Sequence, residues 1–216
     1  MIVGNVKPLE EIAASLSGFE KVMILGCGSC VSVCLSGGEK ASDRLALDLS
    51  GPDLFQGKAP EFRVGAVLRQ CERDLVENYL ELPPDVDAIL SLACGAGVQT
   101  LVKVYHDIPV IPALNTTFLG ALDRPGTWEE KCQGCGSCIL SFTGGICPVT
   151  RCAKRLLNGP CGGSVNGKCE INRDIDCAWQ LIIDRLAALG RLDDYEKIIP
   201  PKDWSRDRGY GGKKRS

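Results

Sequence analysis

Thirteen of the 216 residues are cysteines, and their clustering suits metal binding through sulfur. The count is odd, so complete pairing in disulfides is impossible. The single histidine, His106, can supply at most one nitrogen ligand. Residues 1–16 lack the pattern of a signal peptide, and no apolar run approaches the roughly 18 residues of a membrane span. We therefore expect a cytoplasmic chain with reduced thiols, where clustered cysteines bind metal more often than they cross-link.

Eight of these cysteines fall within 46 residues of the C-terminal half. They are Cys132, Cys135, Cys138, Cys147, Cys152, Cys161, Cys169 and Cys177. The first three and the Cys-Pro pair that follows are typical of ferredoxins, in which three closely spaced cysteines bind one cluster and the Cys-Pro cysteine binds another. Here eight residues separate Cys138 from the Cys-Pro cysteine, Cys147, where ferredoxins have three. The set predicts two [4Fe-4S] clusters. One possible division gives Cys177 to the first three cysteines and the other four to the second cluster.

The N-terminal half carries another pattern, in which Cys27, Cys30 and Cys34 lie close together. On a helix Cys30 and Cys34 would share one face, and the helix N-terminus would favour an anionic cluster. A fourth ligand is needed, and Cys71 or Cys94 can supply it. We favour Cys94, because the glycines that follow it let the backbone approach a bulky group closely. The pattern predicts a third [4Fe-4S] cluster.

Two other interpretations of these cysteines stay open. Cys27 and Cys30 could form a thioredoxin-like redox pair after a strand, although that chemistry needs neither Cys34 nor distant cysteines. Structural zinc is the second alternative. Zinc sites usually combine paired C-x2-C motifs, often with histidine, and the N-terminal pattern has neither.

The elements that would position the N-terminal thiols are short apolar strands separated by helices. Strands are expected over 21–26, 63–69, 88–93 and 110–114. Helices are expected over 39–49, 73–82 and 98–105. This alternation predicts an α/β domain with an open parallel sheet of the flavodoxin or Rossmann type. Cys27, Cys71 and Cys94 each follow a strand, so the sheet should bring all three to the same edge.

The composition changes near Thr127, and we expect two domains. The first, over 1–122, is the α/β domain. The second, over 127–195, is a small cysteine-rich iron–sulfur domain whose stability depends largely on its metal.

Residues 1–126 carry 10 basic and 16 acidic side chains, net −6, and residues 127–216 carry 15 and 11, net +4. The surplus lies in a basic tail, 196–216, which we interpret as a solvated end, or as a docking segment for an acidic partner. Nucleic acid is not expected as a partner, because basic and aromatic residues do not interleave. A membrane is not expected either, because no apolar run is long enough to span one.

Several strings of the sequence together resemble a known family. They are GCGSCVSVC, RQCE, LACGAGVQTL, ALNTTFLG, GGICPVTRCAK and LLNGPCGGSVNGKCE. The chain resembles the methylenetetrahydrofolate reductase C-terminal family over roughly residues 5–195. In particular it is similar to the small iron–sulfur subunit that accompanies the flavin-bearing reductase subunit in acetogenic anaerobes.

The resemblance implies a reaction and partners. The flavin-bearing subunit, with FMN or FAD, reduces 5,10-methylenetetrahydrofolate to 5-methyltetrahydrofolate in the one-carbon branch of the reductive acetyl-CoA pathway. This chain would relay electrons to that flavin and help to hold the complex together, with a further electron-donor subunit as a possible partner. The alternative function is a zinc-binding scaffold that stabilises the flavin subunit. Neither a nucleotide-binding fingerprint nor an acid–base group for catalysis is evident in the sequence.

Overall fold

The computed structural model describes residues 1–51, 54–55 and 57–204. Most of the expected basic tail, 205–216, lies outside the described residues. The chain divides into two compact units. Unit 1 comprises residues 1–118 and 122–128, and unit 2 comprises residues 119–121 and those from 129 onward.

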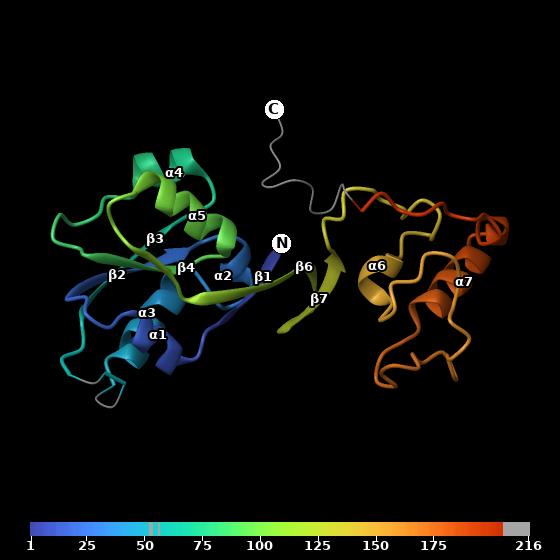
Figure 1. Ribbon diagram of the computed structural model, residues 1–216, viewed down its shortest axis with the longest axis horizontal. Coiled ribbons are helices and arrows are strands. Elements are labelled where there is room, and N and C mark those ends of the chain that lie inside the picture. Colours follow the sequence, from blue (N-terminus) through green and yellow to red (C-terminus); the bar gives the residue numbers. More distant parts are fainter. Residues whose placement is uncertain (52–53, 56, 205–216) are drawn as a thin grey trace. The chain divides into compact units, whose positions relative to one another are not determined.

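Unit 1 is built on a parallel sheet of four strands in the order β3-β2-β4-β5 (Figure 1). The strands are β2 (Lys21–Cys27), β3 (Glu61–Val67), β4 (Ala88–Leu92) and β5 (Val110–Pro112). All three strand pairs are parallel. In the two pairs that β2 forms, Lys21 lies opposite Glu61 of β3, and Val22 lies opposite Ala88 of β4. The predicted α/β class with a parallel sheet is confirmed.

Helices cover both faces of this sheet. They are α1 (Leu9–Ser15), α3 (Glu39–Leu49), α4 (Arg73–Tyr79) and α5 (Gly95–Val104). Because successive side chains of a strand point to opposite faces, β2 contributes to two separate cores. Val22 and Ile24 pack in the core that includes residues of α1 and α3. Met23 and Leu25 pack in the core that includes residues of α4 and α5. This burial on both faces explains why β2 and β4 are almost continuously apolar.

A second, antiparallel sheet of three strands has the order β1-β6-β7. Its strands are β1 (Ile2–Val6), β6 (Leu114–Arg124) and β7 (Thr127–Cys132). This sheet was not predicted from the sequence. Its strands mix exposed and buried residues, and β6 is mostly exposed after its buried first residue, Leu114. Such strands lack the continuous apolar run that marked the parallel sheet.

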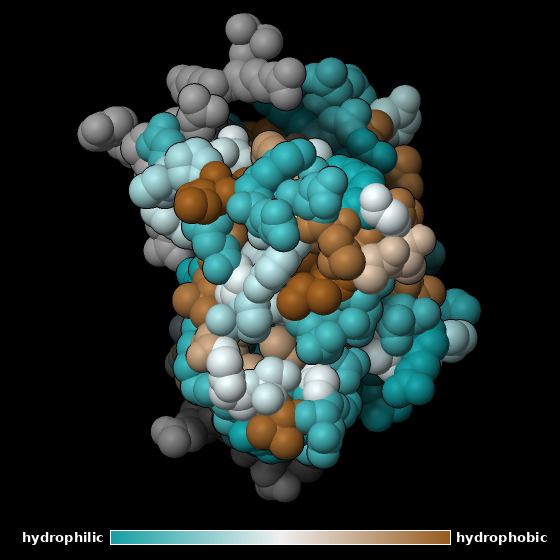
Figure 2. Space-filling view, turned by 90° about the vertical axis from the view of Figure 1, so that its right-hand side faces the viewer, coloured by the Kyte–Doolittle hydropathy of each residue, from teal (hydrophilic) through white to brown (hydrophobic). Residues whose placement is uncertain are grey.

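Unit 2 contains little regular structure beyond α6 (Pro148–Arg151), α7 (Ala178–Ala188) and a short 3-10 helix (Leu192–Asp194). The helix α7 is amphipathic. Three of its residues, Trp179, Ile182 and Leu186, form the buried core of unit 2. Figure 2 shows apolar side chains exposed among hydrophilic ones on the face of the molecule viewed there. A core this small leaves most of the stability of unit 2 to other interactions.

Within the described residues, the structure holds no helix long and apolar enough to cross a bilayer.

Candidate metal centres

Three cysteines of unit 1 lie where strands of the parallel sheet end. Cys27 is the last residue of β2, Cys71 comes four residues after the end of β3, and Cys94 is the N-cap of α5, two residues after β4. The carboxyl ends of parallel strands meet at one edge of a sheet, which is where ligands bind in open α/β folds. The predicted meeting of these three cysteines at one edge is therefore observed.

The surroundings of these three thiols fit a metal centre. Cys27 and Cys94 pack against the same apolar side chains, Val31 and Ala93 among them. The pKa of the Cys71 thiol is raised, first by burial and then by the nearby Cys94 and Cys27. Because nearby thiolates repel one another, a positive centre would favour the ionisation of all three.

Cys30 and Cys34 have different neighbours. Cys30 is the first residue of the single turn α2 (Cys30–Val33), and Cys34 is its C-cap. The amide of Cys34 donates to the carbonyl oxygen of Cys30 at 3.2 Å. The two cysteines are thus one turn apart, as predicted, but a four-residue helix has too few aligned peptides for the expected effect of a helix N-terminus. The Cys34 thiol donates to the carbonyl oxygen of Ile2 on β1 at 3.5 Å.

The thiols of Cys30 and Cys34 also differ in acidity. A hydrogen bond with the backbone of Ile2 lowers the pKa of Cys30. Burial raises the pKa of Cys34, whose residue is 7% exposed. Cys30 is therefore the more readily ionised and the more accessible of the two thiols.

In unit 2 the Cys-Pro cysteine, Cys147, belongs to a segment that contacts the end of β7. The hydroxyl of Thr150 lies 3.5 Å from the carbonyl oxygen of Lys131, the residue before Cys132, and 3.4 Å from that of Cys147. Arg151 forms an ion pair with Glu129 on β7. These contacts bring the segment of Cys147 to the start of the loop that carries Cys132, Cys135 and Cys138.

That loop depends on glycine. Gly134 and Gly136 have φ angles of 66° and 77°, in the left-handed region that L side chains rarely adopt. The amide of Gly134 donates to the sulfur of Cys132 at 3.3 Å. Backbone donors to sulfur stabilise a thiolate ligand and tune the potential of a cluster.

The remaining cysteines of unit 2 line one small pocket. They are Cys152, Cys161, Cys169 and Cys177. The backbone holds two of them in place: the amide of Cys169 donates to Ile175 at 3.0 Å, and that of Cys177 donates to Gly167 at 2.7 Å. The structure thus differs from the division suggested by spacing, since Cys177 lies with these three and Cys147 lies near Cys132. Loops connect these cysteines, and the spacing of cysteines in the sequence does not show which of them a loop brings together.

Charged residues surround this second set of thiols. Lys154 and Arg151 line the same pocket, and Lys154 forms an ion pair with Glu170. Contact with Lys154, and then with Cys161, lowers the pKa of Glu170. Glu170 lies 3.5 Å from the sulfur of Cys161. The Cys161 thiol donates to the Glu170 carboxylate, and both cations of this pocket are paired with carboxylates.

All thirteen cysteines lie in the described part of the chain and are free thiols. In the residues that the structure describes, no three His, Cys, Asp or Glu side chains are close enough together to hold a single metal ion. The four cysteines of a [4Fe-4S] cluster need not converge on a single ion, because each of them binds a different iron atom.

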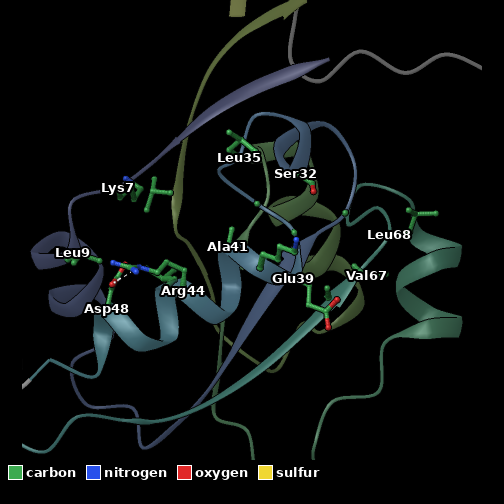
Figure 3. A pocket seen from close by; sticks show the side chains of 17 residues that line it. Lys7, Leu9, Ser32, Leu35, Glu39, Ala41, Arg44, Asp48, Val67 and Leu68 are labelled. Carbon is green, nitrogen blue, oxygen red and sulfur yellow. Dashed lines mark hydrogen bonds and ion pairs between the residues drawn. The ribbon is translucent and has the colours of Figure 1, made fainter. Parts of the chain in front are cut away.

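Unit 1 also contains an open cavity of about 1000 Å³, which lies at the carboxyl ends of β2 and β3 (Figure 3). Gly28, which follows Cys27, and Leu68, which follows β3, are part of its wall. Lys7 and Arg44 line it as well, and each is paired within the unit, with Glu11 and Asp48 respectively. Leu35 on its rim is 77% exposed and has a φ of 60°.

Comparison with known proteins gives one match. Residues 111–205 match the family described as methylene-tetrahydrofolate reductase C terminal. No curated protein and no solved structure matches the chain. The match begins at residue 111, whereas the resemblance was expected from about residue 5, and it includes all eight cysteines of unit 2. Residues 111–205 are thus similar to the methylene-tetrahydrofolate reductase C-terminal family.

Proposed function

We propose that this chain is an iron–sulfur subunit that passes electrons to a flavin-bearing methylenetetrahydrofolate reductase subunit. The observation that carries the proposal is the grouping of thiols at three separate places, in a chain with a matched reductase-related domain. Clusters ligated by cysteine are one-electron carriers. The chain's own residues would hold them, shield them from water and set their potential through burial and hydrogen bonds to sulfur.

The neighbourhoods of the thiols suggest a ligand set for each cluster. In unit 1 the set is Cys27, Cys71 and Cys94, with Cys30 as the fourth ligand. In unit 2 one set is Cys132, Cys135, Cys138 and Cys147. The other is Cys152, Cys161, Cys169 and Cys177. Cys34 is then the thirteenth cysteine and not a ligand, whereas the sequence had left either Cys71 or Cys94 in that position.

A second candidate function is a zinc-binding scaffold for the flavin subunit. It would use the four cysteines that line the pocket of unit 2, Cys152, Cys161, Cys169 and Cys177, which would have to move closer together to share one ion. Four cysteines are a frequent ligand set of structural zinc. The two functions could also coexist, with zinc at this site and clusters at the other two.

Metal analysis of the anaerobically purified chain separates these functions. Three clusters correspond to about twelve iron atoms per chain and a brown colour that dithionite bleaches. About eight iron atoms with one zinc would show that one of the three sites holds zinc in place of a cluster. A colourless protein that contains zinc and no iron would contradict the electron-transfer function.

Electron transfer itself is tested with the flavin subunit present. Replacing Cys94 or Cys135 by Ser substitutes a hard oxygen ligand for sulfur, which is a poor ligand for iron. Activity driven by an electron donor should then fall, while activity driven by an artificial dye, which reduces the flavin directly, should persist. If both activities fall equally and the complex dissociates, the metal centres only stabilise the assembly.

A further inference from the structure

One polar side chain is fully buried at the edge of the sheet where the thiols of unit 1 lie. Gln70 is 0% exposed and makes two hydrogen bonds across the sheet. Its Nε2 donates to the carbonyl oxygen of Leu25 at 2.8 Å, and its Oε1 accepts from the hydroxyl of Ser91 at 2.6 Å. Ser91 is itself 0% exposed.

These three residues are the near neighbours, along the chain, of the three strand-end cysteines. Leu25 is two residues before Cys27 on β2. Gln70 immediately precedes Cys71, and Ser91, on β4, is three residues before Cys94. A single side chain therefore joins the three segments that deliver the thiols, over sequence separations of 45 and 21 residues.

The first turn of α5 packs directly on the same side chain. A Cβ on Gly97 would lie 3.0 Å from the Cβ of Gln70 and 2.7 Å from the Cβ of Ala93. Only glycine lets this turn approach Gln70 so closely. Since Cys94 is the N-cap of α5, the position of Gln70 also limits where that cysteine can lie.

An apolar side chain would fill the same space without the cost of burying an amide. Burying an amide is offset only when its hydrogen bonds are made, and the net gain in stability is then small. What the amide adds over an apolar side chain is a fixed geometry, because two directional bonds hold three strand ends in one arrangement. That geometry matters most where several thiols must meet one bulky group.

We propose that Gln70 is a positioning residue for the metal centre of unit 1, fixing the relative positions of Cys27, Cys71 and Cys94. This inference rests on the proposed function, because it presumes a cluster at these cysteines. Residues that orient metal ligands typically contribute about 10- to 100-fold to metal affinity or activity. We expect a loss of that order in cluster retention when the two hydrogen bonds are removed.

The test uses the full chain, purified anaerobically, and Gln70→Met, which keeps the length of the side chain and removes both bonds. The spectrum that Cys94→Ser removes from the wild type identifies the unit 1 cluster. In Gln70→Met this cluster should release iron to a chelator about 10- to 100-fold faster, and its electron paramagnetic resonance signal should broaden or shift. Signals from unit 2 should not change. If Gln70→Met does not fold, Ser91→Ala removes one of the two bonds and is measured in the same way.

Two further variants separate positioning from stability. Gln70→Met/Ser91→Ala no longer buries an unpaired hydroxyl, so it should recover part of the lost thermal stability without recovering the cluster. Ile12→Val is the matched control, because it lowers the stability of a core that contains no cysteine. It should leave the cluster unaltered.

The outcomes distinguish the two proposals. If the wild type contains no signal that Cys94→Ser removes, the cluster of unit 1 proposed above is absent. If the wild type contains that signal and Gln70→Met keeps it with unchanged spectrum and iron release, only the positioning role is overturned. The positioning role is also overturned if the cluster recovers together with stability in the double variant, or is lost equally in Ile12→Val.

Discussion

At the scale of the residue, Cys34 differs from Cys27, Cys71 and Cys94 in what its thiol contacts. Its thiol donates to the carbonyl oxygen of Ile2 on β1, whose backbone also bonds Cys30, and Cys34 is the more buried of these two cysteines. A buried cysteine with its own hydrogen bond behaves as a small apolar residue with a weak donor. The role of each cysteine therefore depends on its neighbours and not on its place in a spacing pattern.

We predict that Cys34→Ala keeps the full iron content. Cys71→Ser and Cys94→Ser should each lose about four iron atoms per chain, because each removes one thiolate from the unit 1 cluster. Iron and sulfide analysis of the three anaerobically purified variants checks this. A loss of iron in Cys34→Ala, with full retention in Cys71→Ser, would show that the sequence-based choice of ligands was the better one.

Asp85 provides a test of electrostatics in unit 1. It binds Lys21 at 2.7 Å and both terminal nitrogens of Arg63 at 2.7 and 2.8 Å. The hydrogen bond from Lys21, followed by that from Arg63, lowers the pKa of Asp85 to about 2. A carboxyl whose pKa is depressed on folding contributes stability above its unfolded pKa and loses it as the pH falls toward the folded pKa.

We therefore expect Asp85→Asn to melt at a lower temperature than the wild type near neutral pH. The difference should shrink as the pH falls from about 4, the pKa of an unperturbed aspartate, to about 2. Melting curves of both proteins across this range measure it, and a modest size is expected because the groups are partly exposed. A difference that is constant down to pH 2 would exclude the carboxylate's charge as its origin.

Leu35 has an unfavourable backbone conformation that its side chain does not offset by packing. Its φ is 60° and it is 77% exposed. Glycine adopts this region freely, so Leu35→Gly should raise the free energy of unfolding, by about 0.5 kcal/mol. Leu47→Gly is the matched control, because Leu47 is 72% exposed but lies inside α3, where glycine costs about 1 kcal/mol. Chemical denaturation of both variants checks the opposite signs.

At the scale of the element, the two units place their cysteines on different supports. Those of unit 1 follow strands of a sheet with two apolar cores. Those of unit 2 lie mainly on loops around a core of Trp179, Ile182 and Leu186. A support with its own core keeps its shape without metal, whereas loops without one depend on the metal for theirs.

Removal of the metal should accordingly affect the elements unequally. We expect amides of β2 and β4 to keep their protection from hydrogen exchange in the metal-free protein, while loop amides such as those of Cys169 and Cys177 lose theirs. Hydrogen exchange read by mass spectrometry measures both in one sample. Equal protection of the loops with and without metal would refute the dependence of unit 2 on its metal.

At the scale of the whole molecule, the matched domain and the grouped thiols connect this chain to methylenetetrahydrofolate reductase. The proposed role is to supply electrons to a partner that carries the flavin. We predict that the chain alone, loaded with iron, accepts electrons from dithionite but does not reduce 5,10-methylenetetrahydrofolate. Folate reduction by the purified chain, free of added flavin subunit, would contradict a purely electron-carrying role.

The sequence by itself was enough to predict the parallel sheet and the position of three strand-end cysteines at one edge of it. Strands buried on both faces must be continuously apolar, and parallel strands must end at one edge, so both features leave a local pattern. Residues 21–26 and 88–93 showed that pattern, and β2 and β4 lie there. The resemblance to the reductase family likewise depended only on local strings.

Only the tertiary structure decided which cysteines are neighbours elsewhere. The proximity of Cys177 to Cys152, the contact of Cys34 with β1 and the bonds of Gln70 all join residues far apart in the chain. Such contacts depend on the paths of loops and on a second sheet whose partly exposed strands carry no continuous apolar run. The sequence contains a glutamine before Cys71 and a serine within the apolar run 88–93, but only the fold brings the two side chains together in a hydrogen bond.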